Sequence, residues 1–278
     1  MGATLRSLRV AFAGTPDFAV EALRAIMASS HRLVLVFTQP DRPAGRGQKL
    51  MPSPVKACAV ANAIPVYQPS RMGPEAAALL RRERIDVLVV AAFGQIVSEE
   101  ILCAPINGCI NIHASLLPRW RGAAPIVHAL LSGDALSGVS IMKMDRGLDT
   151  GPTLLMRSCP ITATMTQGDL LSALSGLGAT ACVEVLDDLD AYLSTAREQP
   201  QKGVTYAGKI TKSQALIDWE GTADDVSRHV RAFNPFPMAY AFWCGQRVRI
   251  AEVAVFADDC VGAHAPGEVI SVDGRGVL

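Results

Sequence analysis

The sequence has no excess of charge of either sign. It contains 26 Lys and Arg against 26 Asp and Glu, so its formal net charge is zero. Global charge therefore gives no indication of a nucleic-acid partner, although a local basic patch remains open. Uninterrupted apolar runs are also short. The longest, residues 87–93, has the length of a strand, so we expect no membrane partner.

Several motifs are absent as well. The seven cysteines form no C-x-x-C pair, which favours free thiols in a reduced, cytoplasmic compartment. The histidines lack zinc-ligand spacing, so we expect no metal. The apolar stretch 10–13 is too short for a secretory segment. The turn that follows it, residues 14–16, lacks the G-x-G-x-x-G spacing of a nicotinamide-binding fold.

Half of the 278 residues are hydrophobic, enough for a sizeable core. Short apolar runs alternate with helical patterns, which predicts βαβ units and an α/β fold with a mainly parallel, Rossmann-like sheet. Two further runs, 139–144 and 153–159, flank a turn-rich segment and predict an antiparallel pair. We expect strands at 8–13, 33–37, 66–67, 87–91 and 109–113, and helices at 17–27, 54–62, 74–82 and about 166–192.

The composition changes after residue 193. We expect a catalytic domain over 1–193, a polar linker over 194–208, and a second domain over 209–278. The second domain contains one helical pattern at 223–232. Its strand-like runs at 239–243, 247–256 and 267–272 predict a small β-barrel.

A polar pair ends the strand predicted at 109–113. Period-two alternation places Asn111 and His113 on one face of this strand and Ile112 on the other. The carboxyl ends of parallel strands are where open α/β sheets bind ligands. Both side chains can donate hydrogen bonds to an oxygen that develops negative charge. From these residues alone, a catalytic role and a structural role remain equally open.

A turn-borne carboxylate, Asp149, follows in Leu148-Asp149-Thr150-Gly151. D-T-G is also the aspartic-protease signature, but that fold needs two copies and this chain has one. The simplest alternative is a turn aspartate that caps its own loop. With Asn111 and His113 available as partners, we expect Asp149 to lie within hydrogen-bond or one-water reach of His113.

The loop 41–54 is rich in glycine and proline. Its cations Arg42, Arg46 and Lys49 oppose a single acid, Asp41. Such a loop is either solvated and flexible or a basic arm that contacts phosphates and base edges.

The segment His113-Ala-Ser-Leu-Leu-Pro-Arg-Trp-Arg-Gly122 resembles the signature of the folate-dependent formyltransferase family, and Asp149 lies at the expected distance downstream. The segments 12–18, 37–56 and 231–237 make the chain more similar to the methionyl-tRNA branch of that family than to its purine or sugar branches. The resemblance covers essentially the whole chain.

The resemblance implies a formyltransferase fold followed by an OB-like β-barrel that tracks tRNA. It implies a catalytic trio of Asn111, His113 and Asp149, with initiator methionyl-tRNA as acceptor. It also implies 10-formyltetrahydrofolate as a co-substrate, with no tightly bound cofactor. The folate site would be lined by Ser115, Leu116, Leu117 and Pro118 and by the loop residues Phe93, Gln95, Ile96 and Val97. The tRNA would be bound by Arg46, which enters the acceptor stem, and by Arg42, Lys49 and Lys209. We expect a monomer.

Two features depart from the family pattern. From Lys209 onward there are seven basic and nine acidic residues, a poor balance for a tRNA-tracking surface. We also expect the barrel to be truncated at Leu278. Two alternative functions stay open: formyl transfer to another amine, such as an amino sugar, and tRNA binding without catalysis.

Overall fold

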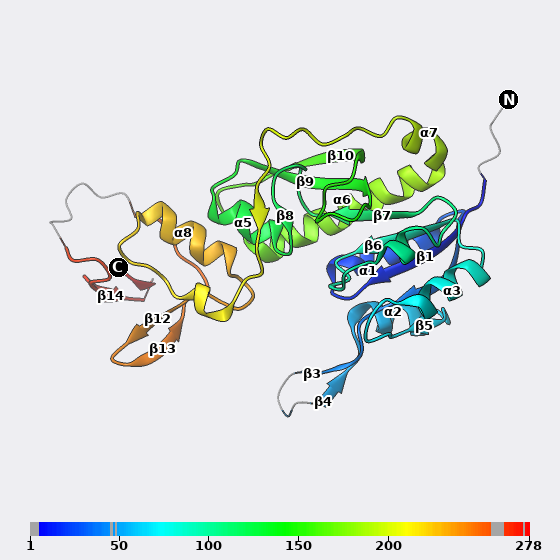
Figure 1. Cartoon of the computed structure of the whole chain (residues 1–278). Helices are drawn as coiled ribbons and strands as arrows, with labels where there is room; N and C mark the ends of the chain where they lie inside the picture. The colour runs from blue at the N-terminus through cyan, green and yellow to red at the C-terminus, as the bar shows by residue number, and fades with distance from the viewer. Residues whose placement is uncertain (1–5, 45–46, 48, 257–263, 275) are drawn as a thin grey trace.

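A seven-stranded sheet organises the first two thirds of the chain (Figure 1). The computed structural model describes residues 6–44, 47, 49–256, 264–274 and 276–278. The strand order is β10-β9-β7-β6-β1-β2-β5. The strands are β1 (Arg9–Gly14), β2 (Arg32–Phe37), β5 (Val66–Tyr67), β6 (Val87–Ala91), β7 (Cys109–His113), β9 (Leu136–Lys143) and β10 (Thr153–Pro160).

The predicted mainly parallel α/β sheet is confirmed. β1 pairs in parallel with β2 and β6, and the parallel pairing continues to β5 on one side and β7 on the other. β9 and β10 add an antiparallel pair at the β7 edge, as expected. Every strand of the parallel part therefore ends at the same edge, where His113 closes β7.

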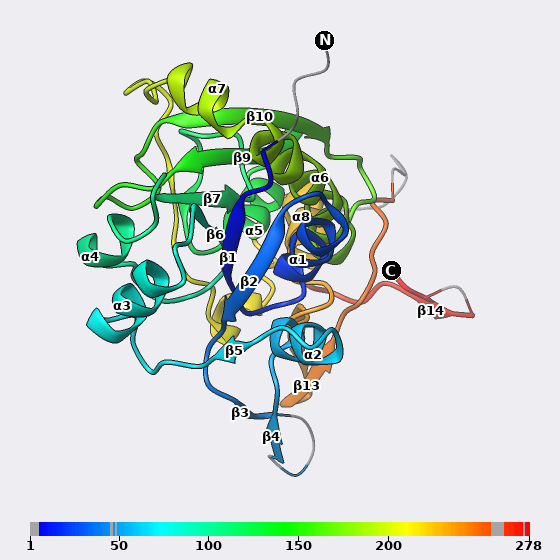
Figure 2. The same ribbon diagram turned by 90° about the vertical axis from the view of Figure 1, so that its right-hand side faces the viewer.

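Helices cover both faces of the sheet. Figure 2 shows α3 and α4 on one side of it and α1 and α6 on the other. The helices are α1 (Phe18–Ala28), α2 (Pro54–Ala61), α3 (Pro74–Arg82), α4 (Glu99–Leu102), α5 (Pro125–Leu131), α6 (Gln167–Asp187), α7 (Leu189–Ser194) and α8 (Ala223–Ala232), with a 3₁₀ turn η1 (Lys212–Ala215).

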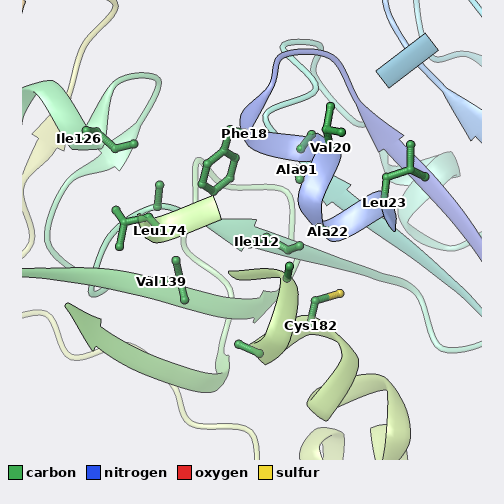
Figure 3. Close-up of a cluster of buried hydrophobic side chains, with 14 of the residues drawn as sticks. Phe18, Val20, Ala22, Leu23, Ala91, Ile112, Ile126, Val139, Leu174 and Cys182 are labelled. Atoms are coloured by element: carbon green, nitrogen blue, oxygen red, sulfur yellow. The ribbon is translucent and has the colours of Figure 1, made fainter. Parts of the chain in front are cut away.

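Alternating side chains of β1 divide the core into two layers. Val10 and Phe12 point to the α1 and α6 side, whereas Ala11 and Ala13 point to the α3 side. All four are fully buried, which is typical of a central parallel strand. Figure 3 shows the first layer, where Ile112 of β7 lies among side chains of α1, α6 and β9. Ile112 thus holds β7 in the core while its neighbours face the other way.

The long helix predicted at about 166–192 is two helices. Asp188 leaves the helical region with φ −137° and ψ 50°, and α7 starts there. The capping box of Thr166 and Asp169 starts α6, which packs on α1, β9 and β10. By length and composition alone α6 could cross a bilayer, but half of its most apolar window is buried inside the protein. Its apolar surface is therefore that of a core helix.

Short strands tie the linker to the first domain. β11 (Tyr206–Ala207) pairs in parallel with β8 (Arg121–Gly122), and Thr153 forms an antiparallel bridge with Arg197. Figure 1 shows this segment running back from α7 along the sheet to β8. Residues 197–207 are therefore attached to the sheet domain by backbone hydrogen bonds.

The expected OB-like barrel is not confirmed. In the described part of 209–278, the strands form two separate hairpins, β12 (Tyr240–Trp243) with β13 (Gln246–Arg249) and β14 (Val272–Asp273) with β15 (Gly276–Val277). The runs predicted at 247–256 and 267–272 are strands only at one end. A strand needs a continuous ladder of backbone hydrogen bonds. Outside β13 and β14, the described parts of these runs make only scattered ones, such as Ile250 N to Ala239 O over 2.9 Å and Ile270 N to Leu278 O over 2.7 Å. α8, by contrast, begins and ends as predicted and packs on α5.

Candidate active site

The three residues of the expected trio meet at the carboxyl edge of the sheet. Asn111 and His113 project from the same face of β7, and Asp149 lies in the turn between β9 and β10. Asn111 Nδ2 lies 3.3 Å from Asp149 Oδ1, and His113 Nδ1 lies 3.6 Å from Asp149 Oδ2. The predicted convergence of these side chains is confirmed by these distances. Their roles stay predictions.

The Asp149 carboxylate has a third neighbour that the sequence did not indicate. The backbone N–H of Gly122 donates to Asp149 Oδ2 over 2.8 Å. With the Asn111 amide this gives the carboxylate two donors, while its side chain is only 15% exposed. The carboxylate is thus held in place beside the histidine.

The orientation of the His113 ring is set by a backbone carbonyl. His113 Nε2 lies 2.9 Å from the Trp120 oxygen, and a carbonyl can only accept, so Nε2 carries a proton. Nδ1 is then the ring nitrogen that remains to act on a substrate. A proton on Nδ1 as well would pair the ring with Asp149 Oδ2.

Arg119, Trp120 and Asp134 form a cluster that stabilises the turn carrying the Trp120 carbonyl. Trp120 has φ +61°, a left-handed conformation that costs a residue with a side chain on the order of 1–3 kcal/mol. Asp134 accepts from Trp120 Nε1 over 2.7 Å and from both ends of the Arg119 guanidinium over 2.6 and 2.8 Å. Burial would raise the pKa of Asp134, but these hydrogen bonds keep that pKa below its ordinary value. The charged Asp134 thereby stabilises the turn that orients His113.

A cavity of about 710 Å³ opens at the trio, within the range of small-molecule sites. Its walls are mainly apolar. The exposed side chains of Ile96 and Leu148 lie on it, 90% and 60% exposed. Other lining residues are Pro16, Phe18, Val90, Phe93, Val97, Met142, Met144 and Leu171.

The predicted loop residues Phe93, Gln95, Ile96 and Val97 all line this cavity. The Gln95 side chain already has protein partners, because Oε1 accepts from Met72 N and Nε2 donates to Pro69 O, each over 3.0 Å. Gln95 therefore anchors the loop. Among the described residues, no hydrogen bond engages the backbone groups of residues 95–97, so these remain available to a ligand.

None of the residues Ser115, Leu116, Leu117 and Pro118 lines this cavity, and their expected place in the folate site stays a prediction. Ser115 and Leu117 are buried. Ser115 Oγ donates to Arg119 O over 2.6 Å, and Leu117 N donates to Ser140 Oγ over 3.1 Å. These residues turn the chain inward and hold the signature segment against β9.

The residues expected to bind tRNA lie on exposed segments. Arg42 and Lys49 are on the hairpin of β3 (Arg42–Ala44) and β4 (Lys49–Met51), and both are exposed. Arg46 lies outside the described residues. Lys209 is exposed at a small hollow next to Leu148 and Gly122. The structure brings Lys209 near the Asp149 turn and leaves the other two on the separate hairpin.

The linker contributes one residue that sequence reasoning missed. Gln199 is 8% exposed and donates to the backbone oxygens of Asp149 and Gly151, each over 2.8 Å. It lies in a polar segment without periodicity, so no sequence pattern could have indicated it.

The fold and this site define the class of protein. The family model "Formyl transferase" matches residues 8–186, and "Formyl transferase, C-terminal domain" matches 209–278. The chain belongs to the formyl transferase family, whose members are group-transfer enzymes.

Curated relatives indicate which branch of the family the chain is most similar to. The chain is 50% identical over 265 residues to a methionyl-tRNA formyltransferase of Chromohalobacter salexigens, covering 95% of this chain and 82% of that protein. It is 51% identical over 273 residues to a methionyl-tRNA formyltransferase of Stenotrophomonas maltophilia, covering 97% and 88%. The expected resemblance to the methionyl-tRNA branch is confirmed.

Solved structures share the fold at lower identity. A sugar N-formyltransferase from a Shewanella species matches with a TM-score of 0.68 and 19% identity, covering 90% of this chain and 99% of that one. An N-formyltransferase from Helicobacter canadensis, in complex with folinic acid and dTDP-3-aminofucose, matches with a TM-score of 0.63 and 21% identity, covering 81% and 80%. At this identity the likeness concerns the fold alone.

Proposed function

We propose that the chain transfers a formyl group from 10-formyltetrahydrofolate to the α-amino group of methionyl initiator tRNA, for translation initiation. The observation that carries this proposal is the convergence of Asn111, His113 and Asp149 on an apolar cavity. About 50% identity to methionyl-tRNA formyltransferases over nearly the whole chain supports the choice of acceptor.

The cavity fits a folate as co-substrate. A pterin ring offers apolar faces and an edge of hydrogen-bond donors and acceptors. The loop 93–97 offers matching features: apolar side chains from Phe93, Ile96 and Val97, and backbone groups without a described partner. This arrangement favours a flat heterocyclic ligand over a flexible aliphatic one. No residue is required to hold a metal, because an N-formyl donor is already activated.

At the cavity edge, charge stabilisation and proton transfer would fall to different side chains of the chain. The second N–H of Asn111 and the positive charge of a doubly protonated His113 ring would stabilise the oxygen that becomes anionic when the amine attacks the formyl carbon. Asp149 would orient His113 and accept the proton lost by the attacking nitrogen, directly or through one water. The same proton would pass to N10 of the folate as the bond between N10 and the formyl carbon breaks and tetrahydrofolate leaves. The Gly122 N–H and the Trp120 carbonyl keep Asp149 and His113 in place during these steps.

The acceptor tRNA would contact the exposed cations Arg42, Arg46, Lys49 and Lys209. Figures 1 and 2 both show the β3–β4 and β12–β13 hairpins projecting on the same side of the molecule. Arg247 and Arg249 on β13 are exposed and add positive charge there. This local charge compensates for the acidic balance of residues 209–278, because phosphate contacts depend on where cations lie. We further propose a cytoplasmic monomer; the free thiols of the described cysteines fit a reduced compartment.

A direct assay with two acceptors tests the proposal. Purified protein and 10-formyltetrahydrofolate should formylate methionyl initiator tRNA and leave a nucleotide-linked amino sugar unchanged. Formylation of the sugar alone would favour the small-amine alternative. Binding of tRNA without any transfer would favour the catalytically silent alternative.

A further inference from the structure

The linker does more than connect two domains, because residues 197–207 border the candidate site. Arg197 exchanges two backbone hydrogen bonds with Thr153, of 2.8 and 2.9 Å. Farther along, Thr205 O accepts from Arg121 N over 2.9 Å, and Thr205 Oγ1 accepts from Trp120 N over 2.8 Å. The linker therefore contacts β10 on one side of the site and the signature segment on the other.

Between these attachments lies the buried side chain of Gln199. Its Nε2 donates to the backbone oxygens of Asp149 and Gly151, each over 2.8 Å. Its Oε1 accepts from the Arg121 guanidinium, over 3.1 Å from Nε and 2.8 Å from Nη2. Both amide protons and both lone pairs of the carboxamide are thus used. A single side chain joins the Asp149 turn to the residue that precedes Gly122.

The Asp149 turn needs such support. Asp149 has φ +52°, a left-handed conformation that is unfavourable for a residue with a side chain. At Gly151 the turn packs so closely on Lys143 that an added side-chain carbon would collide with its backbone oxygen. The carboxylate of Asp149 also accepts from Gly122 N, so its direction depends on both segments that Gln199 joins.

We propose that Gln199 is a positioning residue for the reaction: it fixes the Asp149 turn relative to Gly122, and so directs the Asp149 carboxylate toward His113. The inference rests on the proposed function, since it concerns the same three side chains. Gln199 does not line the cavity, so it acts through Asp149 and not on substrate. Because Gln199 belongs to the linker, a shift of the linker would also move the Asp149 turn.

Two substitutions separate positioning from folding. Gln199→Met keeps the length and removes all four hydrogen bonds. Gln199→Glu keeps the shape and the acceptor for Arg121 but replaces the amide donors with an oxygen that repels two carbonyls. Gln201→Met is the matched control, because Gln201 is exposed in the same linker. Each variant is compared with wild type by thermal melting, kcat and KM.

We expect kcat to fall by about 10- to 100-fold in both Gln199 variants, the range typical for residues that orient a reactive group. KM for 10-formyltetrahydrofolate should stay within about twofold, since the loop 93–97 is not disturbed. Relative to wild type, Gln199→Glu should recover as the pH falls, because a protonated glutamate regains one donor. Gln201→Met should behave as wild type.

NMR of the His113 ring gives a readout that does not depend on activity. The His113 signals, assigned with His113→Gln, should shift in Gln199→Met and not in Gln201→Met. If the melting curve shows that Gln199→Met is unfolded, Gln199→Glu takes its place. Normal kcat and unshifted His113 signals in a folded Gln199 variant would overturn the inference. A wild-type protein that formylates no tRNA would instead overturn the proposed function, and the NMR comparison would still decide the role of Gln199.

Discussion

The sheet domain and the C-terminal hairpins place their aromatic and apolar side chains in opposite environments. Phe12 of β1 is fully buried in the layer between the sheet and helices α1 and α6, whereas Phe242 and Trp243 of β12 are 61% and 57% exposed. The same contrast applies to charge. Asp149 and His113 are almost buried in a hydrogen-bonded cluster, while Arg247 and Arg249 are exposed on a hairpin.

This contrast assigns the two parts of the proposed activity, chemistry and acceptor binding, to different regions of the molecule. Buried, hydrogen-bonded groups keep a fixed geometry, which the chemical step requires. Exposed cations on hairpins are suited to contacts with a large charged acceptor. Substitutions in the first region should therefore lower turnover, and substitutions in the second should weaken use of the acceptor.

The largest effect is expected at the buried cluster. Asp149→Asn removes a charge but little volume, so the protein should fold and bind folate normally. Turnover should fall by about 10² or more, since proton transfer and electrostatic stabilisation are both weakened. His113→Ala should be at least as damaging. Near-normal formylation kinetics in Asp149→Asn would rule out an essential role in proton transfer.

At the basic loop we expect a smaller effect, which should be limited to the kinetics measured with methionyl-tRNA varied. Arg46→Ala should lower kcat/KM for methionyl-tRNA by roughly 10- to 100-fold, the equivalent of one good bidentate contact. Arg46→Lys should recover only part of the lost kcat/KM, because an ammonium lacks the planar fork of a guanidinium. Kinetics with folate varied should be unchanged. Arg24→Ala, on an exposed face of α1, serves as the control. A defect seen only when folate is varied would show that the loop takes no part in acceptor recognition.

Stability should separate the two regions in the same way. Leu174→Ala opens a cavity in the α6 layer shown in Figure 3 and should destabilise the protein by about 2–5 kcal/mol. Phe242→Ala removes a mostly exposed ring and should cost about 1 kcal/mol or less. Denaturant unfolding of both variants measures these costs. Equal losses would show that the hairpin contributes to the core.

The smallest effect is expected for thiol labelling. Burial raises the pKa of Cys182 to about 12, so the reactive thiolate is scarce below that pH in the folded protein. Iodoacetamide at pH 8 should therefore modify the exposed Cys244 and spare Cys182, as mass spectrometry can show. In the unfolded chain both should react. Rapid labelling of Cys182 under native conditions would mean that the α6 layer opens readily.

Sequence reasoning predicted best where burial and periodicity coincide. β6 and β7 match the predicted bounds, and alternation along β7 placed Asn111 and His113 on one face. The resemblance correctly indicated the family. The missed features depend on contacts between distant segments: the Trp120 carbonyl on His113 and the Gln199 amide on the Asp149 turn. Such contacts leave no local pattern. The barrel was expected from strand-like runs, but strand formation also depends on a pairing partner.

We expect His113 and Asp149 to act as one unit, because Asp149 lies against the His113 ring, and a double variant measures the coupling between them. Formylation rates should be measured for His113→Ala, Asp149→Asn and the combination of both. If the two side chains act together, the double variant should be about as slow as the slower single variant, because either substitution already disables the unit. If the two losses multiply, His113 and Asp149 contribute independently, and the account of a single catalytic unit is contradicted.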